Sequence, residues 1–282
     1  MSGTLFVVAT PIGNLDDITA RALRVLGQVT LIAAEDTRRT HHLLMRYAIA
    51  TATTSLHEHN EAKKLPALID RLKRGENIAV VSDAGTPTIS DPGQRLVRAA
   101  VDAGIRVEPI PGPSAIVAAL AASGFAGDSF SFLGFPPTRS KDRKKWFSGL
   151  ATMGGLVVFF EAPHRIVATL GEMTEYIGDC EVAVGRELTK VHEEFLRGRI
   201  SEVVARPTSP VGEFTVVADI GLTTNIVPGQ HVSASDIADE FGRMPVGSGL
   251  SKRQAINQIA GRHGVSTNVV YAAIEQAKKL VE

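Results

Sequence analysis

The chain has 282 residues, 44% hydrophobic and 21% charged, which is the composition of an ordinary globular protein. Its 30 basic and 30 acidic side chains cancel, so any contact with nucleic acid must come from local patches. The single cysteine, Cys180, excludes an internal disulfide. The first residues form neither a signal peptide nor a membrane span. We therefore expect a cytoplasmic protein of two domains, without membrane association.

Strand and helix patterns alternate over residues 1–124, which we expect to form an N-terminal α/β domain. Continuous apolar runs predict buried parallel strands, and the segments between them predict helices. The first four predicted strands are residues 4–9, 29–35, 51–57 and 78–81. The predicted helices include 16–27, 36–49, 60–76 and the segment from Pro92 to about Ala100, with Asp91 as its N-cap.

A second α/β domain is expected over residues 125–224, and a small helical module over 225–282. The strand candidates of the second domain are 130–135, 155–162, 181–188 and 212–222, and residues 162–178 supply a helix. The tail contains two predicted helices around a turn at Gly264, a helix-turn-helix-like shape. That shape is compatible either with RNA docking or with a simple packing appendage.

A basic segment from Thr138 to Phe147 precedes the second strand of this second domain. Its lysines and arginines could grip phosphate, and Trp146 and Phe147 could stack a base. The alternative, which we favour for the two aromatic residues, is that they pack inward from a solvated helix start.

Three loops rich in proline and glycine follow predicted strands of the first domain: residues 8–19, 82–90 and 109–120. Ligands bind beyond the carboxyl ends of the strands in open α/β sheets, so these loops are expected to form one preformed pocket. The loop at 82–90 is followed by Asp91 and contains Asp83 but no lysine or arginine, and both the Walker and GxGxxG patterns are absent from the chain. A polar or cationic small molecule suits such a pocket better than a nucleoside triphosphate does.

No metal site is expected. His57 and His59 have a spacing that could bind a metal ion from one face of a strand, but no third ligand accompanies them. A polar lining is the simpler interpretation.

Six motifs in register then identify a family resemblance. TPIGNLDDIT, AAEDTRRT, VSDAGTPTISDPG, PGPSA, FFEAPHR and RELTK together closely resemble the ribosomal RNA small subunit methyltransferase I family, over about residues 4 to 222. The resemblance implies a two-domain tetrapyrrole-methylase-like fold, that of class III S-adenosylmethionine methyltransferases, with the cofactor between the domains. It also implies 2′-O-methylation of a cytidine ribose in the decoding region of 16S rRNA, and a homodimer.

The resemblance further implies which residues contact S-adenosylmethionine. By motif these are Pro11, Asp83, Ala84, Gly85, Thr86, Ser90, Ser114, Ala115, Phe160, Glu161, Ala162, Glu213, Phe214 and Thr215. An acidic pocket without phosphate-binding residues is a reasonable host for a sulfonium cation.

Methyl transfer to a ribose hydroxyl needs positioned reactants and a group that activates the hydroxyl. Two charged clusters are our candidates for the catalytic residues: Glu35, Asp36 and Arg38 after the second strand, and Glu187 and Lys190 in the second domain. We expect them to face each other, with acids orienting the hydroxyl and Arg38, Arg186 or Lys190 holding phosphate. The alternative is a solvated helix start at 35–39, and no residue is assigned as the base.

Two other functions remain open at this point: a small-molecule methyltransferase of the tetrapyrrole type, and a nucleic-acid-binding regulator that senses a ligand. The basic segment and tail argue against the first. The charged clusters at the strand ends argue against the second. A partner in 16S rRNA or the small ribosomal subunit is therefore expected.

Overall fold

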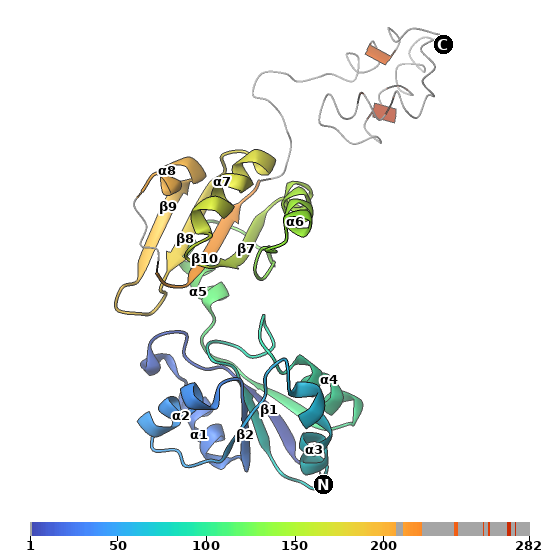
Figure 1. Ribbon diagram of the computed structural model, residues 1–282, viewed down its shortest axis with the longest axis vertical. Helices are drawn as coiled ribbons and strands as arrows, with labels where there is room; N and C mark the ends of the chain where they lie inside the picture. Colours follow the sequence, from blue (N-terminus) through green and yellow to red (C-terminus); the bar gives the residue numbers. More distant parts are fainter. Residues whose placement is uncertain are drawn as a thin grey trace.

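The computed structural model describes residues 2–206 and 211–221, together with seven single residues, Glu240, Phe241, Ile256, Ile259, Val270, Tyr271 and Ile274. The described part of the chain forms two α/β domains that are stacked along the long axis of the molecule (Figure 1). The predicted helical module at 225–282 lies almost entirely outside the described residues, including its turn at Gly264. No helix in the described part is long and apolar enough to cross a membrane.

The first domain is built on five parallel strands in the order β3-β2-β4-β1-β5. This confirms the mainly parallel sheet predicted from the alternating pattern. The strands are β1 Thr4–Val8, β2 Leu31–Ala34, β3 Thr53–Ser55, β4 Ile78–Val81 and β5 Arg106–Ile110. Because all five run the same way, their carboxyl ends and the loops that follow lie at one edge of the sheet.

Helices cover both faces of this sheet, as the continuous apolar strands require. In β2, Ile32 and Ala34 pack in the core cluster of α1 and α2, whereas Leu31 and Ala33 pack in that of α3 and α4. The helices are η1 Leu15–Asp17, α1 Ala20–Gln28, α2 Thr37–Arg46, α3 Glu61–Lys73 and α4 Gln94–Asp102. Every side chain of β2 is therefore buried, on one face or the other.

The start of α4 differs from the prediction. The helix begins at Gln94 with Gly93 as its N-cap, and Gly93 has a φ of +105°, which glycine adopts at little cost. Asp91 is therefore not the cap and Pro92 is not the first helical residue. The two residues instead extend the loop that follows β4, which places Asp91 at the functional edge of the sheet.

The second domain contains a mixed sheet in the order β6-β7-β10-β8-β9, in which β6 and β7 are parallel and the other neighbours antiparallel. Its strands are β6 Phe130–Phe132, β7 Leu156–Glu161, β8 Glu181–Arg186, β9 Glu194–Arg199 and β10 Phe214–Asp219. Strand β9 and the following short helix α8, Ile200–Val204, were not predicted. Three charged residues among the six of β9 hide the apolar pattern of this edge strand.

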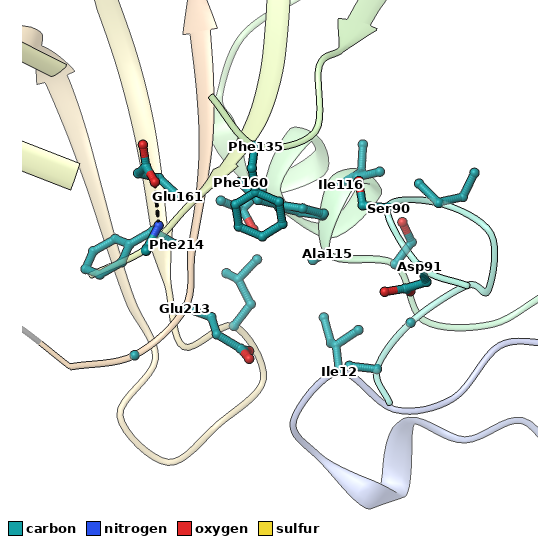
Figure 2. A pocket seen from close by; sticks show the side chains of 18 of the residues that line it. Ile12, Ser90, Asp91, Ala115, Ile116, Phe135, Phe160, Glu161, Glu213 and Phe214 are labelled. Carbon is teal, nitrogen blue, oxygen red and sulfur yellow. Dashed lines mark hydrogen bonds between the residues drawn. The ribbon is translucent and has the colours of Figure 1, made fainter. Parts of the chain in front are cut away.

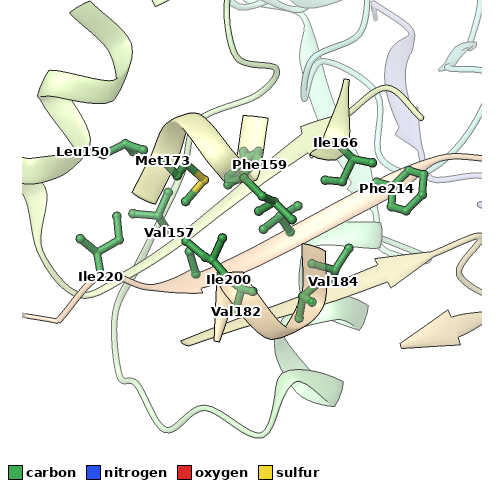
Figure 3. Packing of buried hydrophobic residues seen from close by; sticks show 14 of the residues in the cluster. Leu150, Val157, Phe159, Ile166, Met173, Val182, Val184, Ile200, Phe214 and Ile220 are labelled. Carbon is green, nitrogen blue, oxygen red and sulfur yellow. The ribbon is translucent and has the colours of Figure 1, made fainter. Parts of the chain in front are cut away.

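The two faces of the second sheet are covered by different helices. Helices α6 Ser140–Met153, α7 Ile166–Ile177 and α8 cover the face on which Phe159 and Val184 point (Figure 3). Helix α5, Ala115–Ser123, covers the opposite face, where Ala119 packs against Val158 and Val217. Although α5 precedes the expected domain boundary at 124, it packs on the second sheet, and the chain crosses between the domains before it.

The aromatic residues of the basic segment pack inward, as favoured by the sequence. Phe147 is fully buried, its ring stacked on Tyr176, and Trp146 meets Phe159 edge to face in the same core. Base stacking on Phe147 is therefore excluded. Most of the segment belongs to α6, which begins at Ser140, and this helical frame directs the two rings into the domain.

Candidate active site

Three loops at the carboxyl edge of the first sheet are joined to one another. The amide groups of Thr10 and Gly85 each donate to the other's carbonyl oxygen, at 2.9 and 3.0 Å, and Gly85 has a φ of +79°. The Thr86 hydroxyl donates to the carbonyl of Pro113, 3.4 Å away. The loops after β1, β4 and β5 therefore form one wall, which confirms the prediction of a single preformed site.

This wall faces the second domain across a pocket with a cavity volume of about 370 Å³, which lies between the two domains (Figure 2). The pocket is lined by Ile12, Ala84, Gly85, Thr86, Ile89, Ser90, Asp91, Ser114, Ala115, Ile116, Phe135, Phe160, Glu161, Ala162, Pro163, Leu188, Gly212, Glu213, Phe214 and Thr215. The size is within the range of small-molecule sites.

Most of the expected cofactor residues line this pocket, and two do not. Pro11 is buried beside it, and Asp83 turns away from it toward Glu35 and Asp36. Eight further residues of the lining were not predicted from the sequence. They are one acid, one glycine and six apolar residues: Asp91, Gly212, Ile12, Ile89, Ile116, Phe135, Pro163 and Leu188. Most of these stand beside a predicted residue. Asp91 was counted among the acids of its loop, but it was assigned as a helix cap and not as a residue that lines the pocket.

The electrostatic character of the pocket is negative. Asp91, Glu161 and Glu213 line it, whereas none of its described lining residues is a lysine or an arginine. Of these three acids, Glu161 and Glu213 have cationic partners, Arg165 at 3.2 Å and Lys190 at 3.1 Å. The pocket therefore disfavours phosphate and suits a ligand with positive charge, as predicted.

Glu161 has a structural position at the back of the pocket. Its carboxylate is fully buried, accepts hydrogen bonds from the Thr169 hydroxyl at 2.6 Å and from the Ala162 amide at 2.7 Å, and pairs with Arg165. A buried carboxylate is stable only with such partners. Glu161 thereby holds the turn from β7 to α7, which forms one side of the pocket.

A cluster of acids lies beside the pocket, after β2 and β4. The amide of Asp36 donates to Asp83 at 2.9 Å, and the amide of Asp83 donates to Glu35 at 3.2 Å. Burial raises the pKa of Glu35 above its usual value. Arg39 is 3.5 Å from the Asp83 carboxylate. Strands β2 and β4 are neighbours, so their tips bring these acids together.

Asp36 and Arg38 form a local pair at the start of α2. Asp36 is the N-cap and accepts from the Arg38 amide at 2.8 Å, while the Arg38 guanidinium holds the pKa of Asp36 well below its usual range. The side chain of Arg38 is 87% exposed. Asp36 therefore belongs to a helix start, as the alternative interpretation has it. Arg38 is paired with Asp36 and is exposed to solvent or to a ligand.

The second charged cluster lies in the second domain, next to the pocket-lining residues Leu188 and Glu213. Lys190 binds Glu187 at 2.9 Å and Glu213 at 3.1 Å, while Arg186 donates to the carbonyl of Val211. The same segment touches the first domain, since the Asn14 amide donates to the Thr189 hydroxyl at 3.0 Å. The Glu187 and Lys190 cluster thus lies where the domains meet.

The two histidines do not occupy the predicted strand face. Strand β3 ends at Ser55, and His57 and His59 follow it in a turn, with ring centroids 6.0 Å apart. The side chain of Asn60 lies 2.8 Å from the ring of His57. Within the described ranges no group of three histidine, cysteine or acidic residues could hold a metal ion.

The lining also fits the groups of S-adenosylmethionine. Its acids and the rings of Phe135 and Phe160 favour a cation, through charge and the aromatic faces. Ser114 makes no side-chain cap to α5, so the first amides of this helix remain available to a carboxylate. The pocket thus contains complementary groups for both ends of an amino-acid tail bearing a sulfonium.

Comparison with known proteins first establishes the class. A family model of tetrapyrrole (corrin/porphyrin) methylases matches residues 4–204. A diphthine synthase aligns with a TM-score of 0.62 at 14% identity, covering 77% of this chain and 90% of that one. A uroporphyrin-III C-methyltransferase from Thermus thermophilus, complexed with S-adenosyl homocysteine, aligns with a TM-score of 0.54 at 15% identity, covering 77% and 98%. The fold is that of the tetrapyrrole methylases.

Sequence relatives narrow this class. The ribosomal RNA small subunit methyltransferase I of Thermotoga maritima is 48% identical, covering 76% of this chain and 97% of its own. That of Halalkalibacterium halodurans is 43% identical and covers 97% and 95%. The chain belongs to the ribosomal RNA small subunit methyltransferase I family.

Proposed function

We propose that this protein transfers a methyl group from S-adenosylmethionine to the 2′-hydroxyl of a cytidine ribose in the decoding region of 16S rRNA. The observation that carries this proposal is 43% identity over 276 residues to a small subunit methyltransferase I, covering nearly the whole of both chains. The acidic pocket between the domains supports it, because a methyl donor of this kind carries a sulfonium cation.

When bound, S-adenosylmethionine supplies an electrophilic methyl group. The residues that would hold it are those of the three joined loops and the first turn of α5 on one side, with Phe160 to Ala162 and Glu213 to Thr215 on the other. Their task is to place the methyl group in line with the hydroxyl and to exclude water. A largely apolar wall of Ile12, Ile89 and Ile116 serves the second purpose.

The charged clusters are assigned to the RNA. Arg38, exposed on α2, is suited to a backbone phosphate, and Lys190 is suited to the same role at the domain junction. Glu35, Asp36 and Glu187 would orient the sugar and these two cations. A near-neutral chain gains its specificity from many such local contacts to a folded target.

The natural setting follows from the substrate. We place the enzyme in the cytoplasm, acting on the small ribosomal subunit as a homodimer, and assign RNA docking to residues 225–282. The homodimer can be tested directly, because light scattering of the purified protein measures its molar mass and hence the number of chains. A mass of one chain would contradict the dimer.

The function is tested with labelled S-adenosylmethionine and small subunits that lack the modification. The expected result is label on one ribose 2′-oxygen of a cytidine in 16S rRNA. Binding of the cofactor without transfer would move the protein to another acceptor, such as a small molecule. Absence of cofactor binding would refute the assignment of the pocket.

A further inference from the structure

Asp91 is the one acid of the cofactor pocket whose environment leaves it available for proton transfer. Glu161 is fully buried and bound by Arg165, and Glu213 is bound by Lys190. None of the ion pairs in the described part of the chain includes Asp91. Its carboxylate points from the loop after β4 into the space between the domains (Figure 2).

The loop that carries Asp91 has a costly shape. Thr88 and Ser90 have φ angles of +74° and +63°, a region that non-glycine residues rarely adopt, and Thr88 is β-branched. Such strain persists where the surroundings hold it, and it is concentrated at functional sites. Here the loop is held by Gly85 on one side and by Ser90 close to Gly134 on the other. In this loop Asp91 lines the pocket.

Asp91 also lies between the pocket and the neighbouring strand tips. It lines the pocket and interacts electrostatically with Glu35 after β2 and with Asp83 after β4. The tips of β2 and β4 therefore place charged groups close to Asp91, including Arg39, which is 3.5 Å from Asp83. An RNA acceptor held by these groups would bring its ribose to the Asp91 side of the pocket.

We propose that Asp91 is the catalytic base, and that it accepts the proton of the ribose 2′-hydroxyl during methyl transfer. This inference rests on the proposed function. The Asp91 carboxylate takes the hydroxyl proton while the bond from oxygen to the methyl carbon forms and the bond from that carbon to sulfur breaks. The sulfonium becomes a neutral thioether, and the carboxylic acid returns its proton to solvent.

The ionisation of Asp91 agrees with this role. Burial, aided by the negative charges of Glu35 and Asp83, raises the pKa of Asp91 to about 6, and the Ser82 hydroxyl acts in the opposite direction. The charged groups that face it are Glu35 and Asp83, the latter paired with Arg39, and across the pocket Glu161 and Glu213. A base works best when its pKa lies close to the working pH.

Two measurements test the base. In single turnovers with bound donor and small subunits, Asp91→Asn should lower the rate by about 100-fold or more. Its melting temperature should change little, and a saturating concentration of S-adenosylmethionine removes any effect of the lost charge on donor affinity from the measured rate. In the wild type, kcat/KM should fall as the pH drops below about 6, because the carboxyl becomes protonated. Asp102→Asn, an exposed acid of α4, is the matched control and should behave like the wild type.

A second variant separates ionisation from structure. Glu35→Gln removes a negative neighbour, so the pKa of Asp91 should fall and the acid limb should move to lower pH. Carbon-13 NMR of the Asp91 carboxyl should show the same shift in protein without donor or RNA. This readout is independent of turnover, and it holds even if Asp91→Asn does not fold.

The outcomes are distinguishable. Absence of transfer by the wild type would refute the proposed function, and the base with it. If the wild type transfers the methyl group and the rate of Asp91→Asn is within threefold of the wild-type rate, the proposed function stands and only the assignment of Asp91 as the base is overturned. The assignment of Asp91 as the base would also be overturned if Glu35→Gln did not move the pH at which kcat/KM falls. It would be overturned as well if Asp91→Asn lost affinity for the donor but kept its single-turnover rate.

Discussion

Gly13 of the first domain lies directly against Lys190 of the second. A Cβ atom at Gly13 would stand 2.5 Å from the Cγ of Lys190 and 2.9 Å from the carbonyl oxygen of Leu188. The amide of the next residue, Asn14, donates to the Thr189 hydroxyl. This contact closes the rim of the cofactor pocket, to which Ile12 and Leu188 contribute.

Gly13→Ala is therefore expected to push the two domains apart. The added methyl group must displace backbone as well as side-chain atoms, so the pocket should widen and the dissociation constant for S-adenosylmethionine should rise by roughly tenfold, about 1.4 kcal/mol. Calorimetric titration measures it. Gly27→Ala, inside α1 with open space around it, is the matched control and should stabilise the protein by about 0.5 kcal/mol. Unchanged affinity in Gly13→Ala would contradict the role of this contact.

Arg38→Ala should weaken the contact with small subunits without unfolding the protein. Because Arg38 is 87% exposed and pairs only locally with Asp36, its removal costs little stability. Loss of one phosphate contact should raise KM for subunits by roughly tenfold. It should also reduce the slope of the logarithm of the binding constant against the logarithm of salt concentration by about 1. Arg98→Ala, which removes another highly exposed arginine paired with an aspartate, on α4, is the control. Equal behaviour of the two variants would remove Arg38 from the RNA interface.

Glu161→Ala is expected to be among the most damaging substitutions in the second domain. It leaves the partly buried guanidinium of Arg165 and the Thr169 hydroxyl without their partner, at a cost of about 3 kcal/mol. Denaturant unfolding measures the loss. Glu161→Gln, which keeps the shape and one oxygen, should lose less. A loss below 1 kcal/mol for Glu161→Ala would mean that this network contributes little to the fold.

Cys180 should be unreactive in the folded protein. Burial raises the pKa of the Cys180 thiol to about 11, so almost no thiolate exists at pH 8. We expect alkylation by iodoacetamide to be at least tenfold slower than that of the unfolded chain, as measured by mass spectrometry. The unfolded protein is the control, since it contains the same single cysteine. Equal rates would show that the thiol is accessible.

Local patterns were sufficient to predict much of the first domain. In β2 and β4 every residue is apolar and buried, which predicts strands with helices on both faces. Prolines and glycines directly after such strands predict a site at their carboxyl edge, and the three loops do meet there. The charged edge strand β9 was missed because only alternate residues of an edge strand need be apolar.

The pairing of distant segments was not predictable in the same way. Helix α5 has an apolar sequence that could pack on either sheet. It packs on the second sheet because Val158 and Val217 of that sheet form an apolar face that the helix covers. The junction of Gly13 with Lys190 likewise joins residues that lie far apart along the chain. Such contacts depend on the relative position of whole domains, which the spacing of apolar residues along one helix or strand does not reveal.

The sequence by itself determined every strand of the first domain, the loops at the carboxyl ends of these strands and the family, since these depend on residue types at short spacings. Tertiary structure alone decided the ionisation and direction of Asp91. By spacing, Asp91 reads as the cap of a helix; in the fold, Gly93 takes that place, and Asp91 turns into the pocket beside Glu35 and Asp83. A carboxyl group acquires its proton affinity from burial and from charges brought near it by distant parts of the chain.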